Sequence, residues 1–181
     1  MTNVLRPLFV VCSLCAIFAT SCAAAPPRAR PGTPSVAQKA PDFTIDLLSG
    51  ERFRLADHLG KDVVVLDFWT TFCQPCVGAL AQLETSYQRH RRDGLVVLAV
   101  SIDPPETAAQ VPAFVRTHGL SFPVAHDADS HVTELYDKKA TAPYQVLIAR
   151  DGSIVRIRDM FQPGDEVEME RDVETALSIE K

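Results

Sequence analysis

The chain has 181 residues, with 18 Lys and Arg against 23 Asp and Glu, and a formal net charge of −5 at pH 7. This length suits one domain with a real core and is too short for two large ones. Residues 1–41 hold four basic and no acidic residues, so the remainder has 14 basic and 23 acidic residues, a net charge of −9. Such a domain would repel phosphate backbones, which makes nucleic acid a poor candidate partner.

Residues 1–21 are typical of an export signal. Arg6 precedes an apolar run over residues 8–18, which is too short to cross a bilayer because a spanning helix needs about 20 residues. The tetrapeptide Ala19-Thr-Ser-Cys22 resembles the bacterial lipobox, in which the cysteine becomes the lipid-modified first residue. The alternative is an ordinary secretory signal with Cys22 lost or unmodified. Either interpretation predicts an extracytoplasmic protein of the bacterial periplasm, and the lipobox adds a lipid anchor to the inner or outer membrane.

Residues 22–39 are rich in Ala and Pro and contain no acidic residue. Because this composition cannot bury a core, it predicts a stiff, extended tether. The folded domain is therefore expected over residues 40–181, and we expect it to be a monomer.

The first predicted element is a small hairpin, because two short alternating runs flank the turn dipeptide Ser49-Gly50. A β-branched and apolar segment then predicts a central strand buried on both faces. A helix and a second buried strand follow, which makes a βαβ unit with parallel pairing. These elements cover residues 43–47 and 52–54 (hairpin), 55–59 (helical turn), 63–69 (strand), 74–92 (helix) and 95–102 (strand).

The second half is expected to hold two helices, an antiparallel hairpin around Asp151-Gly152, and a final helix. Parallel strands followed by an antiparallel hairpin predict an α/β fold, with a mixed central sheet and helices on both faces. The expected ranges are 106–117 and 130–136 (helices), 144–149 and 154–158 (strands), and 163–179 (helix).

Cys73 and Cys76 are the only cysteines in the predicted domain. Two intervening residues close almost no loop, so the pair indicates reactivity and not a structural disulfide framework. Cys73 falls at a helix N-terminus, which favours the thiolate, and Pro75 suits the first helical turn. Cys73 is thus the predicted nucleophile and Cys76 the resolving thiol. The other cysteines lie in or at the end of the signal: Cys12, Cys15 and Cys22.

Asp67 lies inside the predicted buried strand, where burial as an ion is expensive. A raised pKa would let it accept the Cys76 proton near neutrality. Alternatively it lies at the strand's end, solvated or paired with a lysine. Trp69 either shields the sulfurs or only packs. A zinc site also uses the C-x-x-C spacing but needs two more ligands, and no other cysteine is available, so no metal is expected.

The segment Asp67-Phe-Trp69 followed by Cys73-Gln-Pro-Cys76 resembles the thioredoxin signature, and residues 40–181 resemble the TlpA/ResA-type thiol–disulfide oxidoreductases, relatives of the AhpC/TSA redoxins. The resemblance implies a thioredoxin fold with an extra N-terminal hairpin and a helical insertion before a cis-proline hairpin. It makes Pro143 the cis-proline facing the disulfide, with Trp69 and the Ala142 backbone at the substrate. A trans turn proline is the alternative.

The resemblance also implies a protein disulfide oxidoreductase without a cofactor. The acid at Asp67 and the expected anchor favour a reductant of disulfides in exported proteins, supplied by a membrane thiol electron donor. Members that act on apocytochrome c often carry an acid a turn beyond the second cysteine, where this chain has Val77-Gly-Ala79. That departure weakens apocytochrome c as the substrate. Phe72, Lys139 and Thr141 depart from the commoner residues as well.

Two other functions compete with this interpretation. A thiol peroxidase of peroxiredoxin type is suggested by the T-x-x-C motif Thr70-Thr-Phe-Cys73, although the Pro expected before it would fall at Leu66. A copper-carrying module could recruit a histidine as third ligand, although such proteins space their cysteines by three residues. The candidate histidines are His118, His126 and His131.

Overall fold

The computed structural model describes residues 38–179. Its main sheet has five strands in the order β5-β4-β3-β6-β7. β3 pairs in parallel with β4 and antiparallel with β6, so the sheet is mixed, as predicted. The strand bounds are β3 Val63–Trp69, β4 Leu95–Ser101, β5 Val124–His126, β6 Tyr144–Ile148 and β7 Ile154–Asp159.

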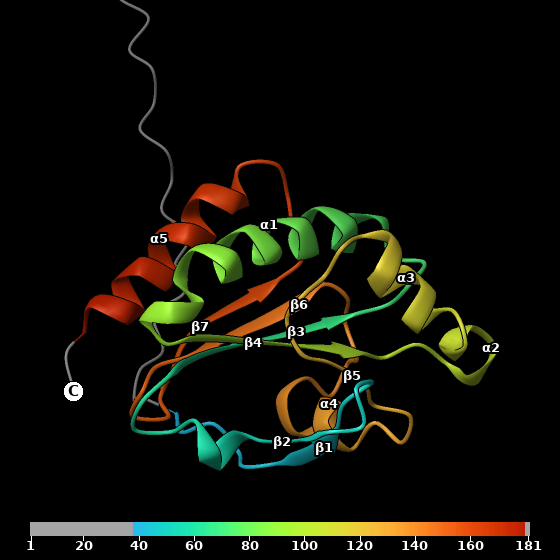
Figure 1. The fold of residues 1–181 in the computed structure, drawn as a ribbon, viewed down its shortest axis with the longest axis horizontal. Coiled ribbons are helices and arrows are strands. Elements are labelled where there is room, and N and C mark those ends of the chain that lie inside the picture. The colour runs from blue at the N-terminus through green and yellow to red at the C-terminus, as the bar shows by residue number, and fades with distance from the viewer. Residues whose placement is uncertain (1–37, 180–181) are drawn as a thin grey trace, which may run out of the picture. The chain divides into compact units, whose positions relative to one another are not determined.

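Helices cover both faces of the sheet (Figure 1). One face carries α1 (Gln74–His90), α3 (Val111–Thr117) and α5 (Asp165–Ser178). The other carries α4 (His131–Tyr136) and the predicted N-terminal hairpin, β1 (Thr44–Asp46) with β2 (Arg52–Arg54). The remaining elements are short: α2 (Pro105–Ala108) and two 3₁₀ turns, Leu55–Asp57 and Arg91–Asp93. The mixed sheet with helices on both faces agrees with the predicted thioredoxin-like α/β fold. Within the described residues no helix is long and apolar enough to cross a membrane.

Strand β3 separates two apolar layers. Every one of its seven residues is buried, and successive side chains point to opposite faces. Val65 and Trp69 join the layer beneath α1 and α5, whereas Leu66 and Phe68 join the layer over α4 and the hairpin. The alternation places Asp67 in the same layer as Val65 and Trp69.

Helix α1 begins and ends at residues suited to those positions. Pro75 lies in its first turn, where a missing N–H costs no hydrogen bond. Gly94, with φ of 93°, follows the last 3₁₀ turn in the left-handed region that glycine tolerates, and the chain enters β4 at the next residue. The helix N-terminus therefore lies at the edge of the sheet where β3 ends.

The predicted helix over residues 106–117 is wrong as one element, because the structure divides it into α2 and α3. Pro112 lies in the first turn of α3 and has no N–H to donate to the Ala108 carbonyl, so one helix cannot run through it. Strand β5 is an addition to the expected elements. It has only three residues, too few to show the alternation of apolar and polar residues that predicts a strand, and it directly follows Pro123, a residue uncommon in strands.

Gln38 and Lys39 lie against the domain. Ile154 N donates to the Gln38 carbonyl at 2.8 Å, and Lys39 Nζ lies 3.0 Å from Asp151 Oδ2. The end of the predicted tether at residue 39 is therefore two residues too far along. The predicted signal, Cys22 and the rest of the tether lie outside the described residues.

Candidate active site

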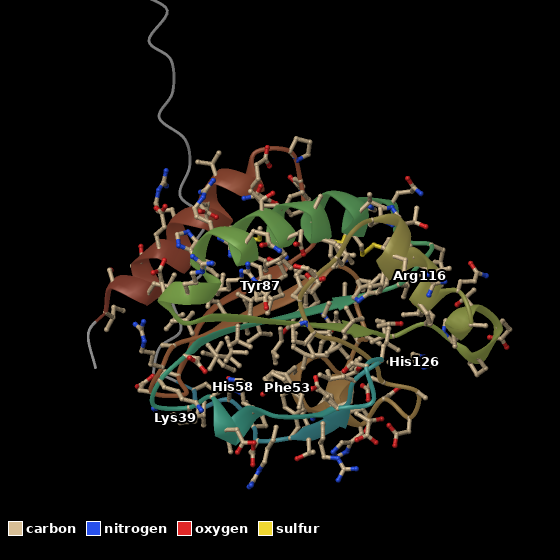
Figure 2. All side chains as sticks on the ribbon, in the orientation of Figure 1. Lys39, Phe53, His58, Tyr87, Arg116 and His126 are labelled. Carbon is tan, nitrogen blue, oxygen red and sulfur yellow. A yellow bond between two sulfur atoms is a disulfide. The ribbon has the colours of Figure 1, made fainter. Side chains whose placement is uncertain are left out.

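Cys73 and Cys76 form a disulfide at the N-terminus of α1, with an S–S distance of 2.00 Å (Figure 2). Cys73 is the N-cap of the helix, and its Sγ accepts a hydrogen bond from Cys76 N at 3.2 Å. Cys73 is partly exposed, whereas Cys76 is 0% exposed. The two sulfurs thus differ in access, since only Cys73 is open to a partner.

The environment of Cys73 favours negative charge in the reduced protein. Helix α1 has 17 residues, and its N-terminus combines the positive end of the helix dipole with the backbone N–H of Cys76, which donates to the sulfur. The preceding loop is closed by Cys73 N, which donates to the Thr70 carbonyl at 3.2 Å. This geometry suits a thiolate that attacks another disulfide.

Asp67 lies in the middle of β3, between Ala99 of β4 and Gln145 of β6. Its side chain is 0% exposed, and neither carboxylate oxygen has a hydrogen-bond partner among the described residues. Burial raises the pKa of Asp67 to about 7, and the Gln145 amide acts in the opposite direction without the geometry of a full hydrogen bond. The solvated or lysine-paired alternative is therefore excluded.

The alternation along the sheet brings Asp67 and Cys76 together in one layer. Cys76, Val65 and Trp69 belong to the same apolar cluster beneath α1, and Asp67 lies between Val65 and Trp69 on that face of β3. A carboxyl group with a pKa near neutrality thus lies in the layer that holds the buried sulfur. Gln145 shares this face of β6 with Leu147, and the sequence analysis did not identify it.

Asp103 holds the loop that leads to Cys73. It is 3% exposed and accepts hydrogen bonds from Thr71 N at 3.0 Å, Thr71 Oγ1 at 2.5 Å and Ser101 Oγ at 2.9 Å. The sequence motifs did not indicate this residue. Because the carboxyl ends of parallel strands meet at one edge of a sheet, the polar residues directly after the second predicted strand could have indicated it.

Pro143 precedes β6, and the Ala142–Pro143 peptide bond is cis, as the resemblance implied. Tyr144 pairs with Phe68, so the antiparallel register puts Pro143 beside Trp69, the last residue of β3. Ala142 is half-buried at the same edge. The cis-proline segment therefore borders the strand end from which the cysteine loop leaves.

Trp69 is not at the surface. Its indole is 0% exposed and packs on Phe114 with ring centroids 4.7 Å apart. The predicted substrate contact of Trp69 is thus corrected to a packing role, because a fully buried ring offers a partner no surface. The aromatic side chain exposed beside the disulfide is Phe72, at 60%.

The three histidines considered as copper ligands lie in different surroundings. His118 stacks on Phe114 with ring centroids 3.9 Å apart, and His126 Nε2 lies 2.8 Å from the Asp103 carbonyl oxygen. His131 is the exposed first residue of α4. Within the described residues, none of them forms a cluster of metal-binding geometry with Cys73 and Cys76.

Comparison with known proteins identifies relatives over most of the domain. A model of the AhpC/TSA family matches residues 36–157. The thiol-disulfide oxidoreductase ResA of Bacillus subtilis (strain 168) is 32% identical over 118 residues, 65% of this chain and 64% of that protein. ResA of Geobacillus kaustophilus is 32% identical over 123 residues, 68% of each chain. The match thus spans about two thirds of the length of these relatives.

Solved structures extend the similarity to the fold. A Chlorobium tepidum protein, provisionally assigned as thiol:disulfide interchange protein DsbE, has a TM-score of 0.72 and 30% identity over 78% of this chain and 97% of that one. A secreted Mycobacterium tuberculosis disulfide oxidoreductase homologous to Escherichia coli DsbE has a TM-score of 0.62 and 23% identity, over 74% and 95%. These similarities confirm the expected resemblance to TlpA/ResA-type thiol–disulfide oxidoreductases and the expected thioredoxin-like fold.

Replacement of Asp67 by Asn is expected to change the pH dependence of stability. The folded-state pKa of Asp67 is raised from 3.8 to about 7, so the folded protein binds the extra proton and loses stability as pH rises between these values. Above pH 7 the buried charge costs about 4 kcal/mol, which the neutral Asn removes. Urea unfolding of the oxidised protein should show Asp67→Asn more stable than the native chain at pH 8, and the difference should disappear near pH 4.

The matched control is Asp57→Asn, since Asp57 is an exposed residue of a 3₁₀ turn. Its pH profile should follow that of the native chain. Parallel profiles for the native chain and Asp67→Asn would contradict the raised pKa.

Loss of the Asp103 contacts is expected to slow the reaction of Cys73. Asp103→Ala leaves Thr71 N–H without its acceptor, which costs about 1–3 kcal/mol of folding stability and frees the loop. Thr71→Val removes only the hydroxyl contact and keeps the carboxylate. Alkylation of the reduced protein by iodoacetamide should be slowed several-fold in Asp103→Ala and less in Thr71→Val. Unchanged rates in both folded variants would restrict Asp103 to a role in stability.

Proposed function

The chain belongs to the AhpC/TSA family, and we propose that it works as a thiol–disulfide oxidoreductase of the ResA and DsbE type, reducing disulfides of exported proteins through Cys73 and Cys76. The observation that carries this proposal is the Cys73–Cys76 disulfide at the N-terminus of α1, with one sulfur accessible and the other buried. Such a pair can carry out two successive thiol–disulfide exchange steps at the N-terminus of one helix.

In the first exchange, the Cys73 thiolate attacks a substrate disulfide and forms a mixed disulfide, and one substrate sulfur leaves as a thiolate. In the second, the Cys76 thiolate attacks the Cys73 sulfur, the Cys73–Cys76 disulfide forms, and the second substrate thiolate is released. The substrate gains two electrons, and the enzyme is oxidised by the same amount. A dithiol donor must then reduce the enzyme disulfide, and we propose a membrane protein of that class.

Asp67 supplies the base for the second exchange. Cys76 is fully buried and its thiol must lose a proton before it can attack. Asp67 lies in the same layer, and its pKa of about 7 lets it accept that proton near neutral pH. As a monomer without a cofactor, the domain needs no further group for this chemistry.

Pro143 and Ala142 form the edge on which a substrate segment is placed. Ala142 is half-buried beside the strand end that leads to Cys73, and its backbone is suited to strand-like pairing with an extended substrate. Phe72, which is 60% exposed, adds an apolar contact next to the reacting sulfur. The buried Trp69 packs in the hydrophobic cluster that Ala142 also contacts.

The domain is proposed to act in the periplasm, with residues 1–21 as signal, Cys22 as lipid anchor and the Ala- and Pro-rich segment as tether. The 16 residue-to-residue steps from Cys22 to Gln38 give a maximum reach of about 55 Å. Lys39 joins the domain at the turn between β6 and β7, away from the disulfide (Figure 2).

A thiol peroxidase is the second candidate. Its support is the Thr70 hydroxyl, which is buried without a hydrogen-bond partner among the described residues and lies three residues before Cys73. The position of the peroxiredoxin Pro is occupied by Leu66, a fully buried residue of β3. Turnover of hydrogen peroxide as fast as turnover of protein disulfides would favour the peroxidase.

The reduction potential of the Cys73–Cys76 pair is expected to be about −250 mV or lower, in the range of a reductant. Equilibration with glutathione buffers, followed by alkylation, measures it. A value of about −120 mV would reverse the proposed direction of electron flow. In the same assay Cys73→Ser should abolish exchange, whereas Cys76→Ser should accumulate the mixed disulfide because the resolving thiol is missing.

Replacement of Cys22 by Ser is expected to release the protein from membranes into the soluble periplasmic fraction, because the lipid-bearing thiol is lost. Cell fractionation with immunoblotting measures this. Cys12→Ser, which changes a cysteine inside the proposed signal, is the control and should leave the membrane fraction unchanged. A native chain that is already soluble would contradict the anchor and leave the disulfide chemistry unaffected.

A further inference from the structure

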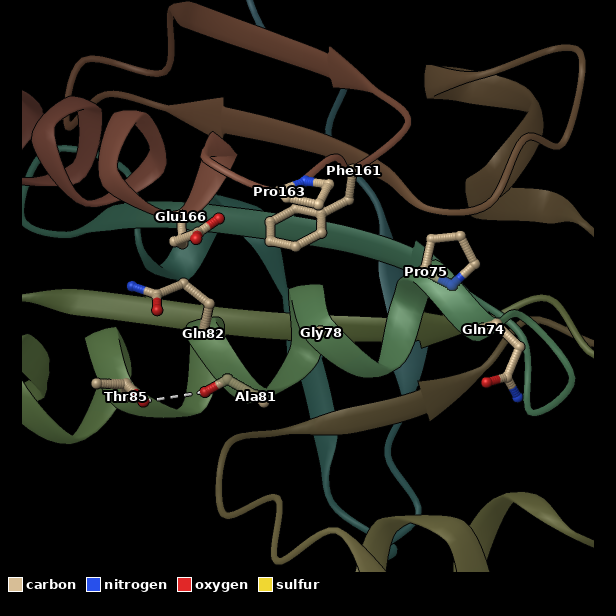
Figure 3. A pocket seen from close by; sticks show the side chains of 9 residues that line it. All are labelled: Gln74, Pro75, Gly78, Ala81, Gln82, Thr85, Phe161, Pro163 and Glu166. Carbon is tan, nitrogen blue, oxygen red and sulfur yellow. Dashed lines mark hydrogen bonds between the residues drawn. The ribbon is translucent and has the colours of Figure 1, made fainter.

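A groove of about 600 Å³ runs along α1, between this helix and the segment that joins β7 to α5 (Figure 3). Gln74 and Pro75, which lie between the two cysteines in the sequence, line one end of it. Phe161 and Pro163 form the wall opposite the helix. Because Gln74 directly follows Cys73, a partner bonded to Cys73 would be held next to this end of the groove.

The absence of a side chain at Gly78 shapes this end of the groove. A Cβ atom at this position would lie 3.3 Å from Phe161 Cε1, tighter than ordinary contact, so the bare helix backbone lets the ring lie close to α1. Phe161, Pro163 and Pro75 then present carbon surface to the groove. This end suits an apolar side chain.

Farther along α1 the groove becomes acidic. Gln82 and Glu166 also line a second hollow of about 370 Å³, so the two form one path. Three carboxylates of α5, spaced four residues apart, line this second hollow: Glu166, Glu170 and Glu174. Arg171 is the one cationic residue among its lining residues, so the formal charge of the lining is −2.

The three carboxylates are not equivalent. Glu170 already accepts hydrogen bonds from Ser86 and Arg89 and lies 2.9 Å from His90 Nε2, so α1 largely satisfies it. Glu166 is half-buried with one acceptor bond from Gly164 N, and Glu174 is exposed. Glu166 and Glu174 are therefore the groups with capacity to bind a cation of a partner.

We propose that this groove binds the segment next to the reacting cysteine in a disulfide-bonded partner protein, with an apolar residue beside that cysteine and a Lys or Arg about four residues farther on. Gln82 is nine positions after Cys73, which is about 14 Å of helix, and an extended chain covers this length in about four residues. The inference rests on the proposed exchange function and specifies its substrate class.

The test uses the reduced full chain and synthetic peptides that carry one cysteine as a mixed disulfide with 5-thio-2-nitrobenzoate. The peptides differ only in the fourth residue from the cysteine, which is Lys, Gln or Glu, and each is made with that residue on either side. Stopped-flow absorbance of the released thiolate gives the rate constant. In low salt we expect one Lys peptide to react at least fivefold faster than its Glu counterpart, and added salt to reduce the ratio.

Variants separate the groove from the general charge of the domain. Glu166→Gln combined with Glu174→Gln should bring the Lys and Glu peptides close to one rate, whereas Arg171→Gln should increase the ratio. Glu168→Gln is the matched control, since Glu168 is exposed on α5 but does not line the groove, and it should keep the native ratio.

Equal rates for the Lys and Glu peptides with the native chain would overturn the inference, and so would a preference that survives the double variant. In both cases peptide reduction would continue and the proposed function would stand. Failure to react with any peptide would instead overturn the proposed function, and the inference with it.

Discussion

The register of strand β3 determines where the reacting groups lie. The strand is paired along its length with β4 on one side and β6 on the other, so its side chains can only alternate between two covered faces. That alternation places Asp67 in the layer of Cys76, and the same strand ends four residues before Cys73. A shift of one residue would move the carboxyl group to the opposite face, away from both sulfurs.

Two opposite electrostatic requirements meet within this layer. The N-terminus of α1 favours a charged sulfur at Cys73, whereas the apolar surroundings of Asp67 disfavour its charge and raise its pKa to about 7. A neutral residue at position 67 would be better for folding near neutral pH. An acid at this position fits the proposed proton transfer, because a base with a pKa near neutrality can accept a proton at that pH.

The sequence was most informative where local pattern and burial agree. The β-branched run predicted the bounds of β3 correctly, and the C-x-x-C motif lies at a helix start, as predicted, with its two cysteines joined in a disulfide. The break between α2 and α3 depends on Pro112, whose effect a helical periodicity does not reveal. Asp103 and Gln145 belong to the site only because strands far apart in sequence meet, and a chain read along its length carries no direct sign of that proximity. The burial of Trp69 beneath Phe114 likewise depends on α3, which is far from Trp69 in the sequence.

The sheet also separates two hydrophobic cores, one on each of its faces. The cluster beneath α1 and α5 contains Cys76 and surrounds Asp67, whereas the cluster over α4 and the hairpin contains Phe43, Phe53 and Val132 and none of the reacting groups. Residues on opposite faces share few partners, so the energetic effects of changes in the two cores should be close to additive. The hairpin core can therefore vary in evolution as an independent module, adjusting the thermal tolerance of the protein while the redox layer keeps its composition.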